Sequence, residues 1–142
     1  MSTQFELSDQ PASLVKLPMS RQAPGLARVH IRGVCHAARM DDEQTNAAVL
    51  VISELVTNAV SHVGSGMVTV EWIRRDDLLL IEVGDEAPHK PPRLHLMTGD
   101  DDEHGRGLPL VMMLTRQFVV LRRDREPGVA SQKIIRVAFD CP

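Results

Sequence analysis

The stretch SELVTNAVSH, residues 53–62, places three polar side chains along one side of a segment that is otherwise apolar. Glu54, Asn58 and His62 are four residues apart, and such positions lie in one row of a helix that turns about 100° per residue. Their neighbours between residues 47 and 63 are mostly Ala, Val, Leu and Ile, a composition typical of a buried helix. Because a buried carboxylate, amide and imidazole need polar partners, the row predicts a ligand site. The alternative is a half-exposed helix whose polar stripe meets water.

The composition is that of one soluble globular domain. The chain has 142 residues, of which 43% are hydrophobic and 25% are charged, and a domain of this size buries about two-thirds of its unfolded surface. A net charge of −3 and an aromatic content of 3% argue against direct binding of nucleic acid or of an acidic membrane surface. We expect a flexible tail over residues 1–12 and a single domain over residues 13–142.

Several features predict a cytoplasmic protein. Cys35 and Cys141 fit free thiols in a reducing compartment. The first residues lack the basic start and apolar core of a signal peptide. No apolar run approaches the length that crosses a membrane.

Two elements should precede the central helix. Residues 14–18 have the pattern of a short edge strand that Pro18 ends. Residues 20–40 predict a helix with Pro24 in its first turn, because apolar side chains recur at helical spacing. These side chains are Ala27, Ile31, Val34 and Ala38. The acidic residues 41–43 then suit the positive end of the next helix.

Two strands should follow the central helix. Residues 67–74 alternate as a half-buried strand does, whereas residues 78–83 are almost continuously apolar and should be central in a sheet. Residues 75–77 make the turn between them. The second strand runs into Asp85, whose carboxylate could accept a hydrogen bond from an exocyclic amine such as that of adenine. A simple turn residue is the alternative.

Residues 86–104 form a long segment without clear periodicity, and such loops are usually functional lids or disordered. His89 and His95 lie in this segment, but they lack partners at metal-ligand spacing, so we assign no metal site to them. The segment leads into Gly105-Arg106-Gly107-Leu108 at the start of an apolar helix. Glycines let backbone N–H groups approach a polyphosphate, and a helix N-terminus adds partial positive charge. A plain glycine-rich loop is the alternative.

The end of the chain predicts a closing antiparallel hairpin. Its strands are residues 118–121 and 133–139, and its turn lies at residues 125–128.

Three of these signals occur in one order: the Glu-x-x-x-Asn-x-x-x-His helix, the Asp that ends a strand, and the Gly-x-Gly that opens a helix. Together they resemble the GHKL (Bergerat-fold) ATPase domain, which gyrase, heat-shock protein 90, histidine kinases and MutL share. Residues 54–62 and 103–108 look more closely like small bacterial anti-sigma factor serine/threonine kinases of the RsbW/SpoIIAB type. The resemblance covers roughly residues 13–139. It implies an α/β two-layer sandwich with a mixed, mainly antiparallel sheet, helices on one face and an ATP lid.

The resemblance implies that the chain binds ATP and magnesium. Asn58 would bind the Mg²⁺ that bridges the ATP phosphates, and Glu54 would be the general base that takes the proton from the attacking hydroxyl. Asp85 would bind the adenine amine. The further nucleotide-binding positions would be His62, Ala87, Gly105, Arg106, Gly107 and Leu108. For His62, a buried and hydrogen-bonded histidine is the alternative.

Two departures from the family pattern keep two function classes open. Ala87 stands where the family usually has Gly or Ser, and residues 131–136 match the family's final strand poorly. The first class is a kinase that phosphorylates a STAS-domain anti-anti-sigma protein and otherwise holds a sigma factor. The second is a nucleotide-dependent protein-binding regulatory module without kinase activity.

A row of arginines on the predicted first helix is the candidate partner-binding surface. Arg28, Arg32 and Arg39 lie beside the apolar stripe, and the resemblance places sigma-factor and anti-anti-sigma contacts near this helix. Arginine is enriched at interface hot spots because its planar fork pairs with carboxylates. A solvated helix face is the alternative, and a homodimer also stays open.

Overall fold

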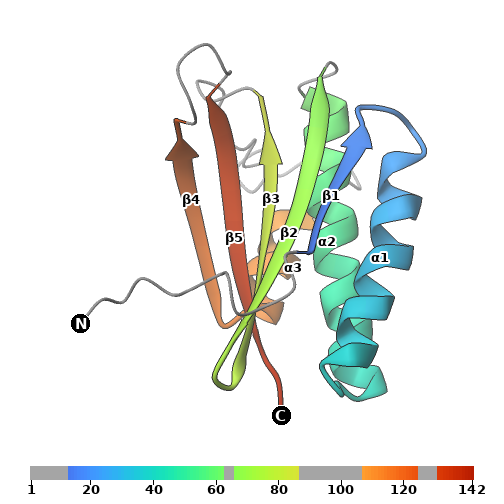
Figure 1. Cartoon of the computed structure of the whole chain (residues 1–142), viewed down its shortest axis with the longest axis vertical. Coiled ribbons are helices and arrows are strands. Elements are labelled where there is room, and N and C mark those ends of the chain that lie inside the picture. The colour runs from blue at the N-terminus through green and yellow to red at the C-terminus, as the bar shows by residue number, and fades with distance from the viewer. Residues whose placement is uncertain (1–12, 63–65, 87–106, 125–130) are drawn as a thin grey trace.

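The computed structural model describes residues 13–62, 66–86, 107–124 and 131–142. It is a two-layer α/β fold in which three helices cover one face of a five-stranded sheet (Figure 1). The helices are α1 (Ala23–Ala37), α2 (Asp42–His62) and α3 (Gly107–Leu114). The strands are β1 (Ser13–Pro18), β2 (Met67–Arg75), β3 (Leu78–Asp85), β4 (Gln117–Arg123) and β5 (Gln132–Asp140). The predicted α/β sandwich is confirmed.

The sheet has the strand order β1-β2-β3-β5-β4. Each of the four neighbouring pairs is antiparallel, so the described strands contain no parallel pair of the kind that a mixed sheet would have. The hairpins β2–β3 and β4–β5 account for two of these pairs, and β3 pairs with β5 between them. The predictions that β1 is an edge strand and that β3 is central are both confirmed.

Helix α2 lies at the centre of the helical layer and packs against α1, α3 and the sheet. Most of its apolar residues are buried, although Leu50 is exposed, and all four members of the predicted α1 stripe are buried. They meet the side of the sheet that carries Leu79, Ile81 and Val137, which are fully enclosed. Burying one Val, Leu or Ile side chain contributes about 1.5–3 kcal/mol. The core therefore fixes α2, and with it the row that holds Glu54 and Asn58.

A reciprocal pair of hydrogen bonds starts α2. The backbone N–H of Gln44 donates to Asp41 Oδ1 (2.7 Å), and the backbone N–H of Asp41 donates to Gln44 Oε1 (2.9 Å). This capping box satisfies two backbone donors that the helix cannot pair internally. The predicted acidic cap is confirmed, with Asp41 as the capping residue.

Helix α1 ends earlier than the sequence predicted, and this changes the arginine row. The helix stops at Ala37, and Arg39 has a φ of 59° in the left-handed region. The backbone N–H groups of Arg39 and Met40 turn back to the carbonyls of His36 and Cys35, both at 3.0 Å. Because the chain leaves the helix in this turn, Arg39 does not continue the row of Arg28 and Arg32. Its predicted place in that row was wrong.

Both cysteines are buried free thiols, as the sequence predicted. Burial raises the pKa of Cys35 to about 11, so this thiol stays protonated and unreactive at neutral pH. Among the residues that the structure describes, no helix is both long and apolar enough to cross a membrane.

Candidate functional site

Two of the predicted site residues lie one helical turn apart at the margin of the core. Glu54 and Asn58 are both partly buried on α2, and Leu55 and Ala59, which follow them in the chain, are buried. The structure thus places them neither in a dry core nor on a freely solvated stripe. His62 is the last residue of α2, and its side chain lies outside the described part of the molecule.

Asp85 lies at the end of the central strand β3 and is almost fully buried. Side chains alternate between the two faces of a strand, so Asp85 lies on the same face as Leu79, Ile81 and Val83 of the core. This is the face that the helices cover (Figure 1). The carboxylate of Asp85, the predicted acceptor, therefore faces the helical layer, which carries Glu54 and Asn58.

Lys133 is the residue of this site that the sequence reasoning missed. It lies on β5 directly opposite Asp85 in the strand register. Lys133 Nζ is 3.3 Å from Asp85 Oδ2, and the two side chains are only 8% and 5% exposed. The available signal was a lysine at the start of the mostly apolar strand segment 133–139, within residues 131–136, which match the family pattern poorly. The structure shows that this lysine brings a cation to the carboxylate of Asp85.

Gly84 allows the three central strands to approach closely just before Asp85. A Cβ atom at this position would lie 2.6 Å from Thr69 Oγ1 and 2.8 Å from Ile134 Cδ1. Across the missing side chain, Gln132 Nε2 donates a hydrogen bond to Thr69 Oγ1 at 3.4 Å. A glycine is therefore required here, and the close packing of β2, β3 and β5 holds the Asp85 end of the strand in place.

The glycine motif is described only at its end. Gly107 is the first residue of α3, whose Val111 is buried in the core against α2. The predicted positions Ala87, Gly105 and Arg106 lie outside the described residues, as do His89, His95 and the side chain of Leu108. The roles proposed for them stay predictions.

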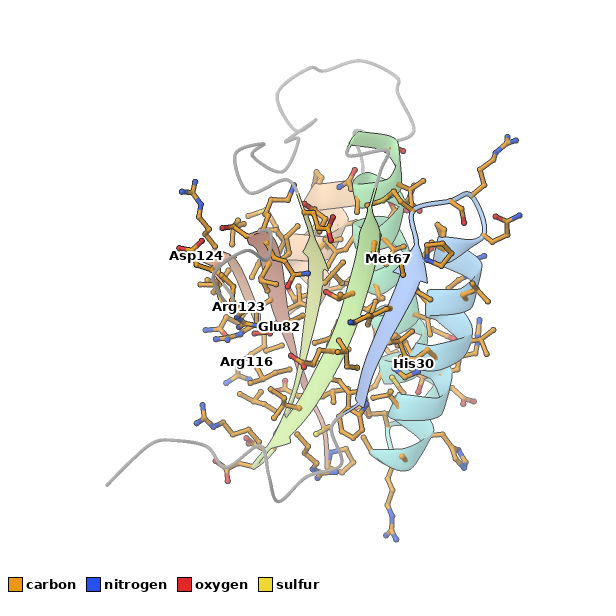
Figure 2. The ribbon with its side chains drawn as sticks, turned by 45° about the horizontal axis from the view of Figure 1, so that its top comes forward. His30, Met67, Glu82, Arg116, Arg123 and Asp124 are labelled. Atoms are coloured by element: carbon orange, nitrogen blue, oxygen red, sulfur yellow. The ribbon has the colours of Figure 1, made fainter. Side chains whose placement is uncertain are left out.

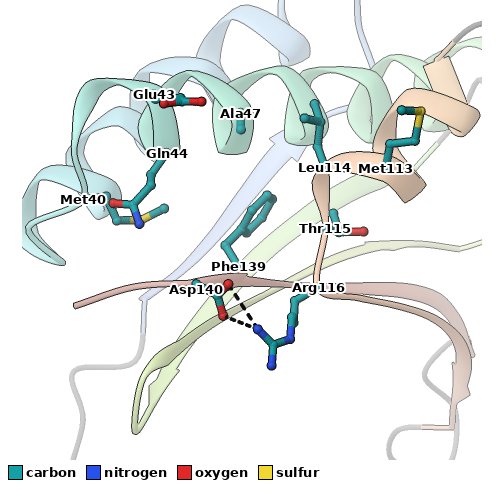
Figure 3. Close-up of a pocket in the computed structure, with 10 residues that line it drawn as sticks. All are labelled: Met40, Glu43, Gln44, Ala47, Met113, Leu114, Thr115, Arg116, Phe139 and Asp140. Atoms are coloured by element: carbon teal, nitrogen blue, oxygen red, sulfur yellow. Dashed lines mark hydrogen bonds and ion pairs between the residues drawn. The ribbon is translucent and has the colours of Figure 1, made fainter.

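Neither of two cavities in the described part of the chain contains a predicted site residue. The larger, about 360 Å³, lies between the start of α2, the end of α3 and the end of β5 (Figure 3). Figure 3 shows Arg116 paired with Asp140 on its floor, at 3.2 Å. The smaller, about 230 Å³, lies on the sheet face that the helices leave open.

Glu82 on the open sheet face is the other buried carboxylate near this region, and it is fully committed to structure. It pairs with Arg123 (Nη1–Oε1, 3.0 Å) and with Arg136 (Nη2–Oε2, 2.6 Å), and Figure 2 shows Glu82 and Arg123 on this side of the sheet. Burial alone would raise the pKa of Glu82, but the hydrogen bonds and charges of the two arginines outweigh it and hold the pKa below its usual value. Glu82 therefore stays ionised and does not join the candidate site of Glu54, Asn58 and Asp85 on the helix-covered face of the sheet, which we call the helix-side site.

The donor set of the helix-side site fits a magnesium nucleotide. An asparagine oxygen such as that of Asn58 is a ligand that Mg²⁺ accepts, and Mg²⁺ usually keeps several waters and substrate phosphates in its shell. Among the described residues, no group of three or more His, Cys, Asp or Glu side chains gathers to hold a metal by itself. Glu54 adds a carboxylate one turn from Asn58, and Asp85 with Lys133 adds one acceptor and one donor for a base.

Comparison with known proteins agrees with this fold. Residues 19–137 match the family model of the histidine kinase-like ATPase domain. A structure of the RsbU and RsbW domains of Rv1364c from Mycobacterium tuberculosis superposes with a TM-score of 0.66 at 18% identity, covering 93% of this chain and 33% of that one. Our chain thus spans about a third of that protein.

A second similar structure is the SiaB–SiaC complex from Pseudomonas aeruginosa. It has a TM-score of 0.60 at 15% identity and covers 92% of this chain and 91% of that one. At these identities the structures share the fold, and no curated protein sequence matches the chain. The family match spans most of the chain, from before α1 into β5. The chain therefore belongs to the histidine kinase-like ATPase domain family.

Proposed function

We propose that the chain is an ATP-dependent serine/threonine kinase of the anti-sigma type, acting in the cytoplasm on a STAS-domain partner and otherwise holding a sigma factor. The observation that carries the proposal is the pair Glu54 and Asn58, partly buried one turn apart on the central helix of a domain in this family. Further support comes from the structural likeness to an RsbW domain.

Each residue has a separate task in the proposed reaction. Asn58 would bind the magnesium of the nucleotide through its amide oxygen, and Asp85 with Lys133 would hold the base. Glu54 would accept the proton of the partner's Ser or Thr hydroxyl as that oxygen attacks. Bound Mg-ATP supplies the phosphoryl group and the charge neutralisation that its transfer needs. Glu54, the proposed general base, lies on a packed helix and not on a loop, so the buried residues of α2 fix its position.

Replacing Asp85 with asparagine should weaken ATP binding. Loss of a charged acceptor from a buried hydrogen bond costs about 1.5–3 kcal/mol, which corresponds to a dissociation constant about 10- to 150-fold higher. Isothermal calorimetry with Mg-ATP measures the change. Asp140→Asn is a matched control, because it removes a carboxylate that pairs with an arginine at the exposed surface. If the unaltered protein binds no nucleotide, the proposed function fails.

The exposed arginines of α1 are the proposed partner surface. Arg28 Nη1 donates to Ser53 Oγ at 2.9 Å, so this arginine connects α1 to the residue before Glu54. Arg32 is exposed one turn further along α1, at the same i, i+4 spacing. Partner contacts here would thus lie close to the α2 turn that carries the proposed base.

Arg32→Glu should weaken capture of the partner while leaving ATP binding and the melting temperature unchanged. Charge reversal in an interface weakens association most at low salt, whereas exposed substitutions usually change stability by only about ±0.5 kcal/mol. Partner affinity is measured at two salt concentrations, with Arg122→Glu on the opposite edge strand β4 as the control. Equal partner affinities for Arg32→Glu and the unaltered protein would show that this face of α1 is solvated and does not bind the partner.

The second candidate function is a nucleotide-dependent binding module without phosphoryl transfer. Lys133 favours it, because this residue lies in the strand segment that matches the family pattern poorly and stands beside the carboxylate proposed to hold the nucleotide base. Radiolabelled ATP offered with purified STAS-domain partners separates the two functions. Label on the partner supports the kinase, and binding of partner and nucleotide without label supports the module.

A further inference from the structure

The Asp85–Lys133 pair presents a hydrogen-bond acceptor and a donor side by side on the helix-covered face of the sheet. The two residues are direct partners across β3 and β5, and their charged atoms are 3.3 Å apart. Both side chains are more than nine-tenths buried, so the pair is shielded from competing water. This end of the two strands is where the proposed function puts the base of the nucleotide.

A lone carboxylate and a carboxylate–ammonium pair select bases differently. The adenine edge offers an exocyclic amine as donor and N7 as acceptor, whereas guanine replaces that amine with the acceptor O6. A lone carboxylate therefore accepts the adenine amine and repels O6. An ammonium beside it gives O6 a donor, while the ring N1–H of guanine can donate to the carboxylate.

We propose that Lys133 and Asp85 together read the purine edge, so that the site accepts guanine as well as adenine nucleotides. The inference rests on the proposed nucleotide site and deepens it, because it names the residue that sets base specificity. With adenine, Asp85 accepts from the amine and Lys133 donates to N7. With guanine, Asp85 accepts from N1–H and Lys133 donates to O6 and N7. In both cases each buried charge keeps a partner.

The chemistry of lysine suits this role. Its ammonium is a compact charge with three donors on a flexible stem, so it can keep the bond to Asp85 and donate to a base atom as well. The other buried carboxylate shows the contrast. Glu82 lies on the open face between two arginines, whose planar forks close around it.

Calorimetry of the unaltered protein with Mg-ADP, Mg-GDP and Mg-IDP tests the proposal directly. We expect the dissociation constant for GDP to lie within about 30-fold of that for ADP. IDP keeps O6 and N1–H but lacks the 2-amino group of guanine, so it should follow GDP. If ADP binds and both GDP and IDP are more than 30-fold weaker, the base-reading role is overturned and the proposed ATP site stands. If no nucleotide binds, both fail.

A variant assigns the effect to the lysine. Lys133→Met keeps the stem and removes the donors, so it should raise the GDP/ADP ratio of dissociation constants at least tenfold. The matched control is Lys16→Met on the exposed surface of β1, which should leave the ratio unchanged. A ratio that Lys133→Met changes by less than threefold contradicts the proposal. Should this variant not fold, Lys133→Arg takes its place, because a guanidinium also donates to O6 and N7, and loss of GDP binding there contradicts the proposal.

Discussion

Replacing Glu54 with glutamine should lower phosphoryl transfer to a STAS-domain partner about 10²- to 10⁴-fold, which is the usual contribution of a general base. Glutamine keeps the shape of the side chain and loses its basicity. Glu54 is only partly buried, and the core of α2 is formed by other residues, so the variant should fold normally. Nucleotide affinity should stay unchanged, because the proposed contacts to ATP come from Asn58, Asp85 and Lys133.

The measurement compares initial rates of label transfer from radiolabelled ATP with nucleotide affinity by calorimetry. Glu43→Gln is the matched control, since it makes the same chemical change at an exposed position at the start of the same helix. Transfer rates for Glu54→Gln within threefold of the unaltered protein would exclude Glu54 as the base. A parallel loss of nucleotide binding would instead place Glu54 in the binding of the nucleotide.

Periodicity predicted most of the fold because each element carries its own pattern. The apolar side chains that recur every three or four residues in α1 are buried as expected, and the nearly continuous apolar run of β3 is the central strand. Local hydrogen-bonding signals were also reliable, as the Asp41–Gln44 capping box shows. These features depend on residues within one or two turns of each other, so the sequence contains all the information that they need.

Features that depend on strand register were not predictable in the same way. Asp85 and Lys133 meet only because β3 pairs with β5 in one register, although α3 and β4 lie between them in the chain. Glu82 on β3 likewise pairs with Arg136 on the neighbouring strand β5 and with Arg123 on β4, one strand further away. The early end of α1 also escaped prediction, since Arg39 carries no glycine-like signal for its left-handed backbone.

Two ion pairs lie at opposite ends of β5 and differ in exposure: Lys133 with Asp85, and Arg116 with Asp140. This difference allows a controlled stability experiment. The Lys133–Asp85 side chains are 8% and 5% exposed, whereas the Arg116–Asp140 side chains are 67% and 60% exposed. Removing one partner of a buried pair leaves an uncompensated charge in a poorly polarisable environment. Removing one partner of an exposed pair leaves a charge that water solvates.

Lys133→Met should therefore lower the free energy of unfolding by about 3–5 kcal/mol, and Arg116→Met by no more than about 1 kcal/mol. A double-mutant cycle then isolates the pair itself. With Asp85→Asn in the background no buried carboxylate is left unpaired, so the double variant Asp85→Asn/Lys133→Met should be more stable than Lys133→Met alone. Urea unfolding at pH 7 is measured for the four proteins of the cycle and for Arg116→Met. If Lys133→Met costs no more than Arg116→Met, Asp85 finds another partner when the lysine is absent, and the charge pair is not what holds the end of β3 to β5.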